Sequence, residues 1–393
     1  MKASIIVPSY NAKERLHYNL LSLNQQDYPF DDFEVIVIDN GSTDNTLELL
    51  KTFKANYSLI PVRIEQNRGI AYGRNQGIVN ATGDILIFHD SDMIAAKDYV
   101  RKHIEAHQDD HSVICGLFWK RIYSFYYPNF EPFHIEKFKT HAHKYPNKQL
   151  SNTEKTTLIT KGQIINGSFM DYAFDLDLHL IHSLKEIINR HGESLSGYHS
   201  PWRFFYTNNS SVLRKNVLDI GTFDDRIVKY GYEDYDLAIR LHKSEHQFKL
   251  RTDIVSVHQE HPTNLTSLND SIENINYLCQ KYNDIRSLDI QLIFSGRFSQ
   301  DETNAIMGDI LKLRHSNEYD DLLSVFLQLL HLERKRNFGN KIELSNEVLN
   351  WPEIQQKLSA LRQKFGMRDF IEAFQRLVKR IYQMDILTED VIT

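Results

Sequence analysis

From the N-terminus to Leu117, short apolar runs alternate with amphipathic stretches. The apolar runs, rich in β-branched residues, predict strands at residues 4–7, 34–38, 62–64, 85–88 and 113–117. The stretches between them predict helices at residues 13–26, 43–55, 71–81 and 97–107. Strands that alternate with helices are typical of a parallel sheet with helices on both faces, so this part of the chain predicts an α/β fold.

The C-terminal part has a different pattern. Apolar residues recur at three- and four-residue steps in the segments 309–314, 319–334, 354–365 and 370–384. No heptad run is long enough to predict a coiled coil. We therefore expect a first domain over 1–268, with halves at 1–117 and 118–268, followed by an α-helical domain over 269–393. The helices of this second domain are a candidate surface for homo-oligomer formation.

The amino-acid composition limits which classes of protein this chain can belong to. The chain has 393 residues, of which 41% are hydrophobic and 25% charged, as in ordinary soluble globular proteins. Its net charge of −6, without a basic block, argues against a nucleic-acid partner. No apolar run approaches the ~20 residues of a transmembrane segment. The N-terminal residues indicate a strand and not a signal peptide, and two cysteines, Cys115 and Cys279, indicate a reducing compartment. We expect a cytoplasmic protein and leave peripheral attachment to a membrane open.

The most informative chemistry follows the predicted strand 85–88. Asp90 and Asp92 lie there at alternate positions, and open α/β sheets bind ligands at the carboxyl ends of their strands. Carboxylate oxygens suit Mg²⁺ or Mn²⁺, which neutralises a diphosphate. The alternative is a pair of solvated acids. Two further triplets of this form occur, Asp175-Leu176-Asp177 and Asp234-Tyr235-Asp236.

Two earlier segments belong to the same predicted sheet edge. Asp39 ends the second predicted strand, and its carboxylate is able to accept the imide N–H of uracil while Tyr10 or Pro8 packs against the ring. The alternative is a helix cap after Gly41. In the segment 67–77, Arg74 is suited either to bind phosphate or to hold carboxylates in position. The segment is not a P-loop, and no dinucleotide fingerprint follows the first strand.

Two later segments supply candidate acid–base and metal groups. Glu233 and Asp234 open a predicted buried helix, where they either cap its first turn or provide a carboxylate base. The sequence His258-Gln259-Glu260-His261 has the spacing of a zinc site, but Pro262 and the position of the glutamate argue against the helical zinc motif. We interpret His258 as a single strand-end imidazole that completes an acidic Mn²⁺ site.

The middle of the chain, 118–205, is rich in aromatic residues and histidines. The aromatic residues form either a sugar-stacking surface or a small separate core, and the sequence leaves both open. The histidines are too scattered to predict a metal cluster.

Together these motifs resemble family 2 glycosyltransferases of the GT-A fold, from Ser4 to about Pro262. The motifs that carry the resemblance are 5–11, 37–44, 67–77, 89–92 and 231–234. The resemblance implies an inverting transferase that uses a nucleotide-activated sugar, usually linked to uridine diphosphate (UDP), together with Mn²⁺ or Mg²⁺.

The resemblance also implies a role for each motif. The first half, 1–117, would bind the donor and the second, 118–268, the acceptor, which is an unknown hydroxyl compound. Asp92 and His258 would ligate the metal, Asp90 would reach the ribose or the metal, and Asp234 would be the base beside Glu233. The remaining residues implied in donor or acceptor binding are Pro8, Tyr10, Asp39, Asn67 and Arg74 for the nucleotide and diphosphate, and Trp202, Arg203, Asn208 and Asn209 for the donor sugar or acceptor.

Three alternatives remain at this level. The chain lacks the Q-x-x-R-W motif and membrane helices of processive synthases, which argues against a polymerising synthase. We expect transfer to a cell-surface or secreted glycoconjugate, with a peptide or small-molecule acceptor as the alternative. A metal-dependent nucleotidyltransferase would share the acidic site but leave Asp234 without a role. A carbohydrate-binding module would need neither the metal ligands nor a base.

Overall fold

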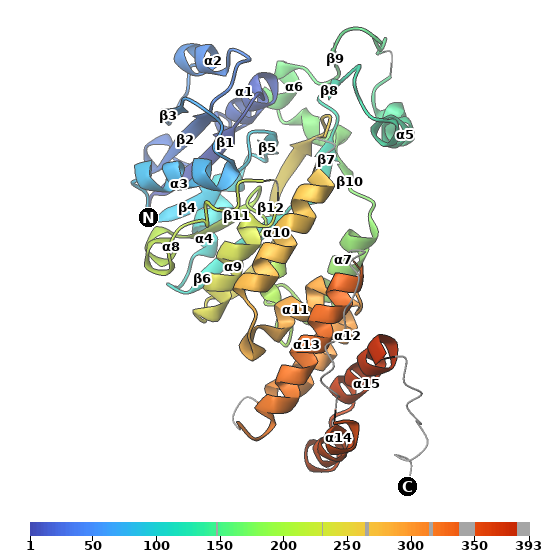
Figure 1. Cartoon of the computed structure of the whole chain (residues 1–393). Coiled ribbons are helices and arrows are strands. Elements are labelled where there is room, and N and C mark those ends of the chain that lie inside the picture. The colour runs from blue at the N-terminus through green and yellow to red at the C-terminus, as the bar shows by residue number, and fades with distance from the viewer. Residues whose placement is uncertain (147, 230, 264–266, 314–316, 338–349, 383–393) are drawn as a thin grey trace. The chain divides into compact units, whose positions relative to one another are not determined.

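The computed structural model describes the chain except residues 147, 230, 264–266, 314–316, 338–349 and 383–393 (Figure 1). It divides into two compact units. Unit 1 comprises Met1–Gly197 and Pro201–Asn274, and unit 2 comprises Tyr198–Ser200 and Ile275–Thr393. The division after Asn274 falls within helix α10, Ser267–Lys281, which also contains the boundary expected from the sequence, residue 268.

Unit 1 is built around one mixed, mostly parallel sheet. Its strand order is β10-β7-β12-β6-β11-β4-β1-β2-β3, with β5 paired to β12. The strands are β1 Ala3–Ser9, β2 Phe33–Asn40, β3 Ser58–Ile64, β4 Ile85–Phe88, β5 Met93–Ala95, β6 Ser112–Leu117, β7 Lys120–Ile122, β10 Phe174–Asp175, β11 Ser210–Leu213 and β12 Gln247–Gln259. All five predicted strands are present, so the predicted α/β fold is confirmed. The sequence did not reveal β11, which runs antiparallel between β4 and β6.

Alternate residues of the central strands face different helices. Ile5 and Val7 of β1 belong to a buried cluster that includes residues of α1, Lys13–Leu23, and α4, Tyr99–Ala106. On the opposite face lies α3, Ile70–Asn80, where a Cβ at Gly77 would come within 2.4 Å of Ile6 Cγ2. A larger residue at Gly77 would push α3 away from the sheet. Helix α2, Thr46–Thr52, completes the four predicted helices of this region.

The aromatic residues of the middle segment form a core. Tyr123, Phe125 and Phe138 are at most 5% exposed and belong to one buried cluster. Ring contacts continue through it, with Tyr123 and Phe138 5.0 Å apart between centroids. The structure therefore favours the packing alternative over a sugar-stacking surface for this cluster. The elements of this segment are β8 Phe125–Tyr126, α5 Pro132–His141, β9 Thr156–Thr157, α6 Lys161–Ile165 and α7 His179–His191.

Unit 2 is α-helical in its described part, as predicted. Its helices are α11 Leu288–Phe294, α12 Gln300–Leu311, α13 Asp320–Asn337, α14 Trp351–Phe365 and α15 Asp369–Tyr382. Phe326, Phe370 and Phe374 lie at the centre of its buried cluster. The predicted helix at 309–314 is the end of the longer α12, and Arg314 and Met384 fall outside the described residues.

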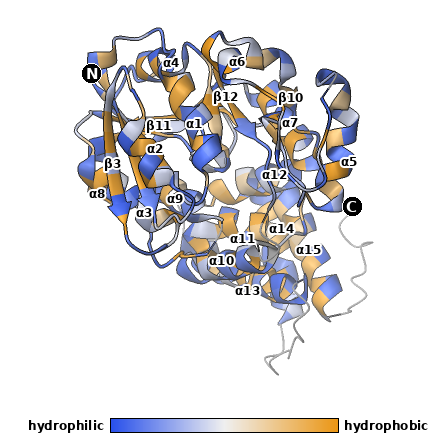
Figure 2. Cartoon of the chain, turned by 90° about the horizontal axis from the view of Figure 1, so that it is seen from above, coloured by the Kyte–Doolittle hydropathy of each residue, from blue (hydrophilic) through white to orange (hydrophobic). Residues whose placement is uncertain are grey.

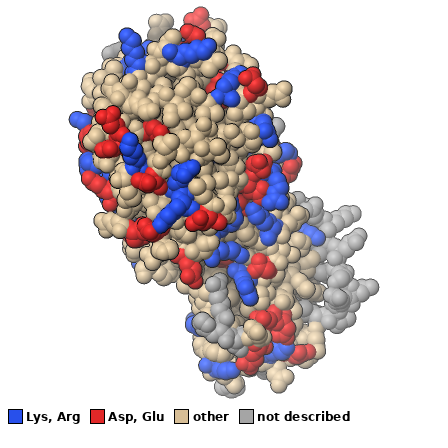
Figure 3. Space-filling model, turned by 90° about the vertical axis from the view of Figure 1, so that its left-hand side faces the viewer, with Lys and Arg blue, Asp and Glu red and all other residues tan. Residues whose placement is uncertain are grey.

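Polar and apolar residues are distributed differently along the helices and over the surface. Hydrophobic and hydrophilic residues alternate along the helices in Figure 2, as expected of helices that bury one face. On the face drawn in Figure 3, acidic and basic side chains are interspersed. Among the described residues, no helix combines the length and the apolar character that crossing a bilayer requires.

A chain of buried histidines connects β4, α4 and β11. His89 Nδ1 lies 3.1 Å from the Tyr99 hydroxyl, and the two ring nitrogens of His103 lie 2.9 Å from Ser211 Oγ and 3.0 Å from Asn209 Oδ1. His107 Nε2 contacts the same Ser211 hydroxyl at 2.8 Å. Burial lowers the pKa of His89 and His103 to about 3, and of His107 to about 4.

This network predicts a loss of folding stability in mild acid. Below about pH 6.5 the histidines of the unfolded chain take up protons that the buried ones do not, so the free energy of unfolding falls as pH falls. Each buried histidine would contribute a loss of roughly 2 kcal/mol at pH 5. Urea denaturation at pH 7, 6 and 5 measures the slope, and His107→Gln should reduce it. His182→Gln, at an exposed histidine, is the control and should leave the slope unchanged. The same unchanged slope in His107→Gln would contradict the proposal that the buried histidines cause the loss of stability in acid.

Candidate functional site

Asp39 is fixed at the end of β2. Its Oδ1 accepts the Ser42 N–H at 3.0 Å, and its Oδ2 lies 2.5 Å from Arg63 Nη1. The carboxylate is only 1% exposed. The polar contacts at the start of α2 come from Asp44, which accepts the Thr46 N–H at 3.2 Å, so helix capping does not account for Asp39. A buried, oriented carboxylate at a strand end is suited to accept a ligand N–H.

The loops around Asp39 hold one another in position. Asn11 Oδ1 accepts the Thr43 N–H at 2.8 Å, which joins the loop after β1 to the loop after β2. Asn67 Oδ1 accepts from Asn40 Nδ2 at 3.1 Å and from the Gly69 N–H at 2.9 Å. The Asn67 side-chain oxygen therefore bonds to the scaffold. Beside these loops Tyr10 is 49% exposed, whereas Pro8 is buried in β1.

Arg74 joins two parts of the site from within the protein. Its Nη2 lies 2.8 Å from Asp90 Oδ1, and its Nη1 lies 2.6 Å from Glu233 Oε1. Burial would lower the pKa of Arg74, but the two carboxylates raise it, so the guanidinium stays charged. Arg74 is 1% exposed, and both outer nitrogens are bound to carboxylates. These contacts agree with the alternative in which Arg74 holds the carboxylates in position, and a place for it near the diphosphate stays a prediction.

Asp92 lies against two imidazoles. Strand β5 pairs with β12 so that Met93 is opposite His258, which brings Asp92 Oδ2 to 3.5 Å from His258 Nε2. The His261 Nε2 lies closer to this oxygen, at 3.1 Å. Burial would raise the pKa of Asp92, but the two histidines hold it well below the usual range.

The Asp92 group is the one set of donors among the described residues with the spacing of a metal site. One ligand atom each from Asp92, His258 and His261 lies within 4.8 Å of the others. Asp92 Oδ1 and His258 Nδ1 are also buried without a partner in the described part of the chain. Asp90 is not in this group, since its carboxylate pairs with Arg74. His261 was missed by sequence reasoning, although its spacing from His258 was the available signal.

Glu233 and Asp234 open helix α9, Glu233–Lys243, as the sequence predicted. Glu233 is 5% exposed and pairs with Arg74. Asp234 Oδ1 accepts the Tyr235 N–H at 2.8 Å. Burial and then the negative charge of Glu233 raise the pKa of Asp234 to about 8. A carboxyl with a pKa near neutrality is suited to take up a proton during a reaction.

Two of the four residues expected near the donor sugar are structural. Trp202 is fully buried, with its ring 5.2 Å from that of Tyr235. Asn209 is 1% exposed, and its amide nitrogen donates to Leu117 O at 2.8 Å and to Ile254 O at 3.0 Å. Both side chains are thus packed into the scaffold in this structure, and their expected roles near the donor sugar or the acceptor stay predictions. Arg203 and Asn208 are half-buried.

The Arg74 pairs predict a large effect on stability. Arg74→Met would leave Glu233 buried without its counter-charge, and breaking a buried pair in this way costs roughly 3–5 kcal/mol. Urea denaturation of Arg74→Met and of the double variant Arg74→Met with Glu233→Gln measures this, and the double variant should recover part of the loss.

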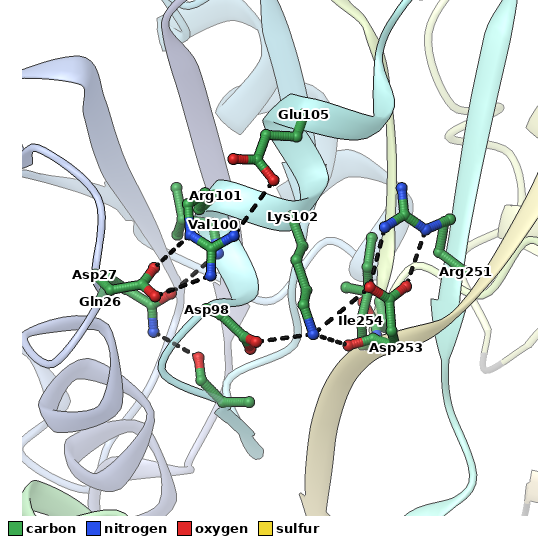
Figure 4. A network of polar contacts seen from close by, with 12 residues as sticks. Gln26, Asp27, Asp98, Val100, Arg101, Lys102, Glu105, Arg251, Asp253 and Ile254 are labelled. Carbon is green, nitrogen blue, oxygen red and sulfur yellow. Dashed lines mark hydrogen bonds and ion pairs between the residues drawn. The ribbon is translucent and has the colours of Figure 1, made fainter.

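A matched control lies on the surface of the same unit. Arg101 Nη2 pairs with Asp27 at 3.0 Å and its Nη1 with Glu105 at 3.3 Å, beside Lys102 and its acidic neighbours (Figure 4). Because its side chain is 34% exposed and water screens its ion pairs, Arg101→Met should lower the free energy of unfolding far less than Arg74→Met does. Equal losses for Arg74→Met and Arg101→Met would contradict the role of the buried pairs.

The chain is similar in sequence to known proteins. Residues 4–165 match the model of "Glycosyl transferase family 2". A Bacillus subtilis (strain 168) protein named "Uncharacterized glycosyltransferase YfnE" is 52% identical over 398 aligned residues, which cover 100% of both chains. The poly(ribitol-phosphate) β-N-acetylglucosaminyltransferase TarS of Staphylococcus aureus (strain Mu50 / ATCC 700699) is 38% identical over 103 residues, covering 26% of this chain and 17% of TarS.

Solved structures show more distant similarity. The mannosyltransferase PcManGT from Pyrobaculum calidifontis, in complex with GDP-Man and Mn²⁺, has a TM-score of 0.48 and 16% identity, covering 98% of this chain and 88% of PcManGT. S. aureus TarS 1–349, in complex with UDP-GlcNAc, has a TM-score of 0.44 and 16% identity, covering 98% and 92%. Family membership rests on the sequence matches alone. The full-length match at 52% identity, together with the family model, shows that this chain is a glycosyltransferase and belongs to glycosyltransferase family 2.

Proposed function

We propose that this protein is a metal-dependent, inverting glycosyltransferase that moves a sugar from a nucleoside diphosphate to an acceptor hydroxyl. The proposed nucleoside diphosphate is UDP. The observation that carries the proposal is the Arg74 bridge. It ties Asp90, two residues before the candidate metal ligand Asp92, to Glu233, the neighbour of the candidate base Asp234. Leaving-group stabilisation and proton removal are the two requirements of one displacement at an anomeric carbon.

Asp39 supports the choice of uridine. Its two oxygens are bound by the Ser42 N–H and by Arg63, and the side chain is 1% exposed, so acceptance of the imide N–H of uracil would require the 30% exposed Arg63 side chain to move aside. The exposed ring of Tyr10 is available to pack against the base. Asp90, although bound to Arg74 through one oxygen, is 27% exposed in its side chain and remains a candidate for the ribose.

Asp92, His258 and His261 would hold the cation. A bound divalent cation supplies charge neutralisation to the departing diphosphate. A set of one carboxylate and two imidazoles favours a transition-metal ion, so we propose Mn²⁺ over Mg²⁺. His261 therefore joins His258 as a ligand in this proposal, and Asp90 is left out of the ligand set.

Asp234 would act as the base. As the acceptor oxygen attacks the anomeric carbon, the bond from that carbon to the diphosphate oxygen breaks and the acceptor proton moves to Asp234. A single displacement inverts the anomeric centre without a covalent intermediate. We propose a cytoplasmic enzyme that modifies a cell-surface or secreted glycoconjugate.

Replacing the base tests this mechanism. Asp234→Asn keeps the size of the side chain and removes the proton acceptor, so kcat should fall by roughly 10²–10⁴-fold with little change in the Kd for UDP. In the wild type, kcat/KM should rise with pH and level off above about pH 8, since only the ionised carboxylate accepts a proton. NMR of the product should show a β-linkage from an α-linked donor. A retained configuration, or a severe loss in Glu233→Gln with near-normal Asp234→Asn, would refute these roles.

Metal binding tests the ligand set independently of turnover. Asp92→Ala should abolish Mn²⁺ binding followed by electron paramagnetic resonance, and His258→Ala and His261→Ala should each weaken it by ~10-fold or more. The control is His182→Ala, whose exposed imidazole lies outside the group. Wild-type affinity in His261→Ala would remove that residue from the set. Full activity in EDTA-treated enzyme with no measurable metal would refute metal dependence.

A further inference from the structure

We propose that Tyr206 and Tyr232 form a platform that binds the pyranose ring of a carbohydrate acceptor beside Asp234. This inference rests on the proposed function and names the class of its acceptor. Tyr206 lies outside the motifs of the sequence analysis, and Tyr232, which lies within the motif 231–234, was given no role there.

The two tyrosines flank a third, Tyr235. The ring centroid of Tyr235 lies 5.9 Å from that of Tyr206 and 5.5 Å from that of Tyr232. The hydroxyls of Tyr206 and Tyr235 are 3.0 Å apart. Tyr235 is buried, whereas Tyr206 and Tyr232 are half-buried and keep part of their surface exposed.

Buried aromatic rings pack against the tyrosines of the platform. Phe118 stacks on Tyr206 with centroids 3.9 Å apart, and Trp202 packs edge-on against Tyr235 at 5.2 Å. Phe118 and Trp202 are 4% and 0% exposed. Tyrosines held in this way present amphipathic surface and lose little conformational entropy when a ligand binds.

The backbone at Tyr232 is in a conformation that tyrosine rarely adopts. Its φ of 69° and ψ of 2° lie in the left-handed region, directly after Gly231, whose φ is also positive. The Gly231 carbonyl accepts from Asn274 Nδ2 at 2.8 Å, which fixes the turn. Backbone strain at a bulky residue is typical of functional positions, which supports a role for the Tyr232 side chain.

Sheet topology puts these tyrosines on the acceptor side of the site. In the order β2-β1-β4-β11, Asp39 ends β2, Asp90 follows β4 and Tyr206 precedes the antiparallel β11, so all three lie at one edge. The nucleotide position at Asp39 and the platform at Tyr206 thus lie on opposite sides of Asp90. Tyr232 directly precedes Glu233 and Asp234 at the start of α9, and the Tyr206 hydroxyl lies 3.0 Å from that of Tyr235, the residue after Asp234, so both tyrosines lie close to the base.

The chemistry of this surface suits a sugar. A pyranose has an apolar face of C–H groups that packs on an aromatic ring, and hydroxyls at its rim that bond to phenols. Asp234 at the edge of the platform would meet a rim hydroxyl, which is the group that attacks the donor. A peptide or lipid acceptor would not need this combination of ring faces and phenol hydroxyls.

Saturation-transfer NMR tests the platform with defined probes. The full-length protein with UDP is mixed with the methyl glycosides of glucose, galactose, mannose and N-acetylglucosamine. The wild type should transfer saturation to the ring protons of at least one glycoside. Tyr232→Asn removes the ring, and asparagine is tolerated at the positive φ of this position. This variant should lower the saturation-transfer signal by about fivefold, as expected for the loss of one aromatic contact. Tyr232→Phe keeps the ring face and should retain most of it.

A matched control separates the side chain from the backbone. Glu245 is exposed, has a φ of 63° and lies beyond the other end of α9, so Glu245→Asn makes the same kind of change away from the platform and should retain the wild-type signal. No saturation of any glycoside in the wild type, or an unaltered signal in Tyr232→Asn, would overturn the inference. A parallel loss of affinity for UDP-glucose would reassign the platform to the donor sugar.

The proposed function has its own readout in the same samples. Metal-dependent hydrolysis of UDP-sugars by the wild type, without an acceptor, tests donor chemistry alone. Its absence for every nucleotide sugar would refute the proposed function, whereas glycoside binding that depends on Tyr232 would still stand.

Discussion

The buried guanidinium of Arg74 is the constraint on which the site depends. It is shared by Asp90 at the end of β4 and Glu233 at the start of α9, at 2.8 and 2.6 Å. In a buried environment an unpaired charge is far more costly than at the surface, so each of the three groups requires the others. The pairs therefore fix the position of a helix start relative to a strand end, although 159 residues separate Arg74 from Glu233.

The packing of α3 makes this bridge possible. Gly77 lets the helix approach Ile6 and Ile38 of the sheet, where any Cβ would lie within 2.9 Å of both side chains. One turn earlier on α3, Arg74 reaches the carboxyl edge of the strands. Asn75 then holds the segment before α9, because its amide exchanges hydrogen bonds of 2.9 Å with the backbone of Phe223. Close helix–sheet packing thus determines where the charge lies.

The carboxylates of the site differ in environment, which suits them to different tasks. Asp92 lies between imidazoles that favour its charged form, so its pKa is low and it is suited to bind a cation. Asp234 lies beside Glu233, and burial with this like charge raises its pKa. The positive charge of Arg74 partly compensates the negative charges of Asp90 and Glu233, and its two ion pairs fix the positions of both carboxylates. In the proposed mechanism, these neighbours are what would separate metal binding at Asp92 from proton transfer at Asp234.

The sequence by itself determined many of the elements and their order. Local periodicity identified five strands of the sheet, the helices α1 to α4, α9 and α12 to α15, and the strand-end acids, because side-chain alternation and helical spacing are properties of neighbouring residues. It also brought Asp39, Asp90 and Asp92 to one predicted sheet edge. The family resemblance, which rests on short motifs in order, was confirmed by the matches to known glycosyltransferases.

Only the tertiary structure decided which side chains meet. It assigned Arg74 to two carboxylates, brought His261 to Asp92 through the pairing of β5 with β12, and buried Trp202 and Asn209 in the scaffold. It also turned the aromatic middle segment into a core and left Tyr206 and Tyr232 partly exposed. The reason is physical: burial and ion pairing depend on contacts between residues distant in sequence, and no local pattern records those contacts.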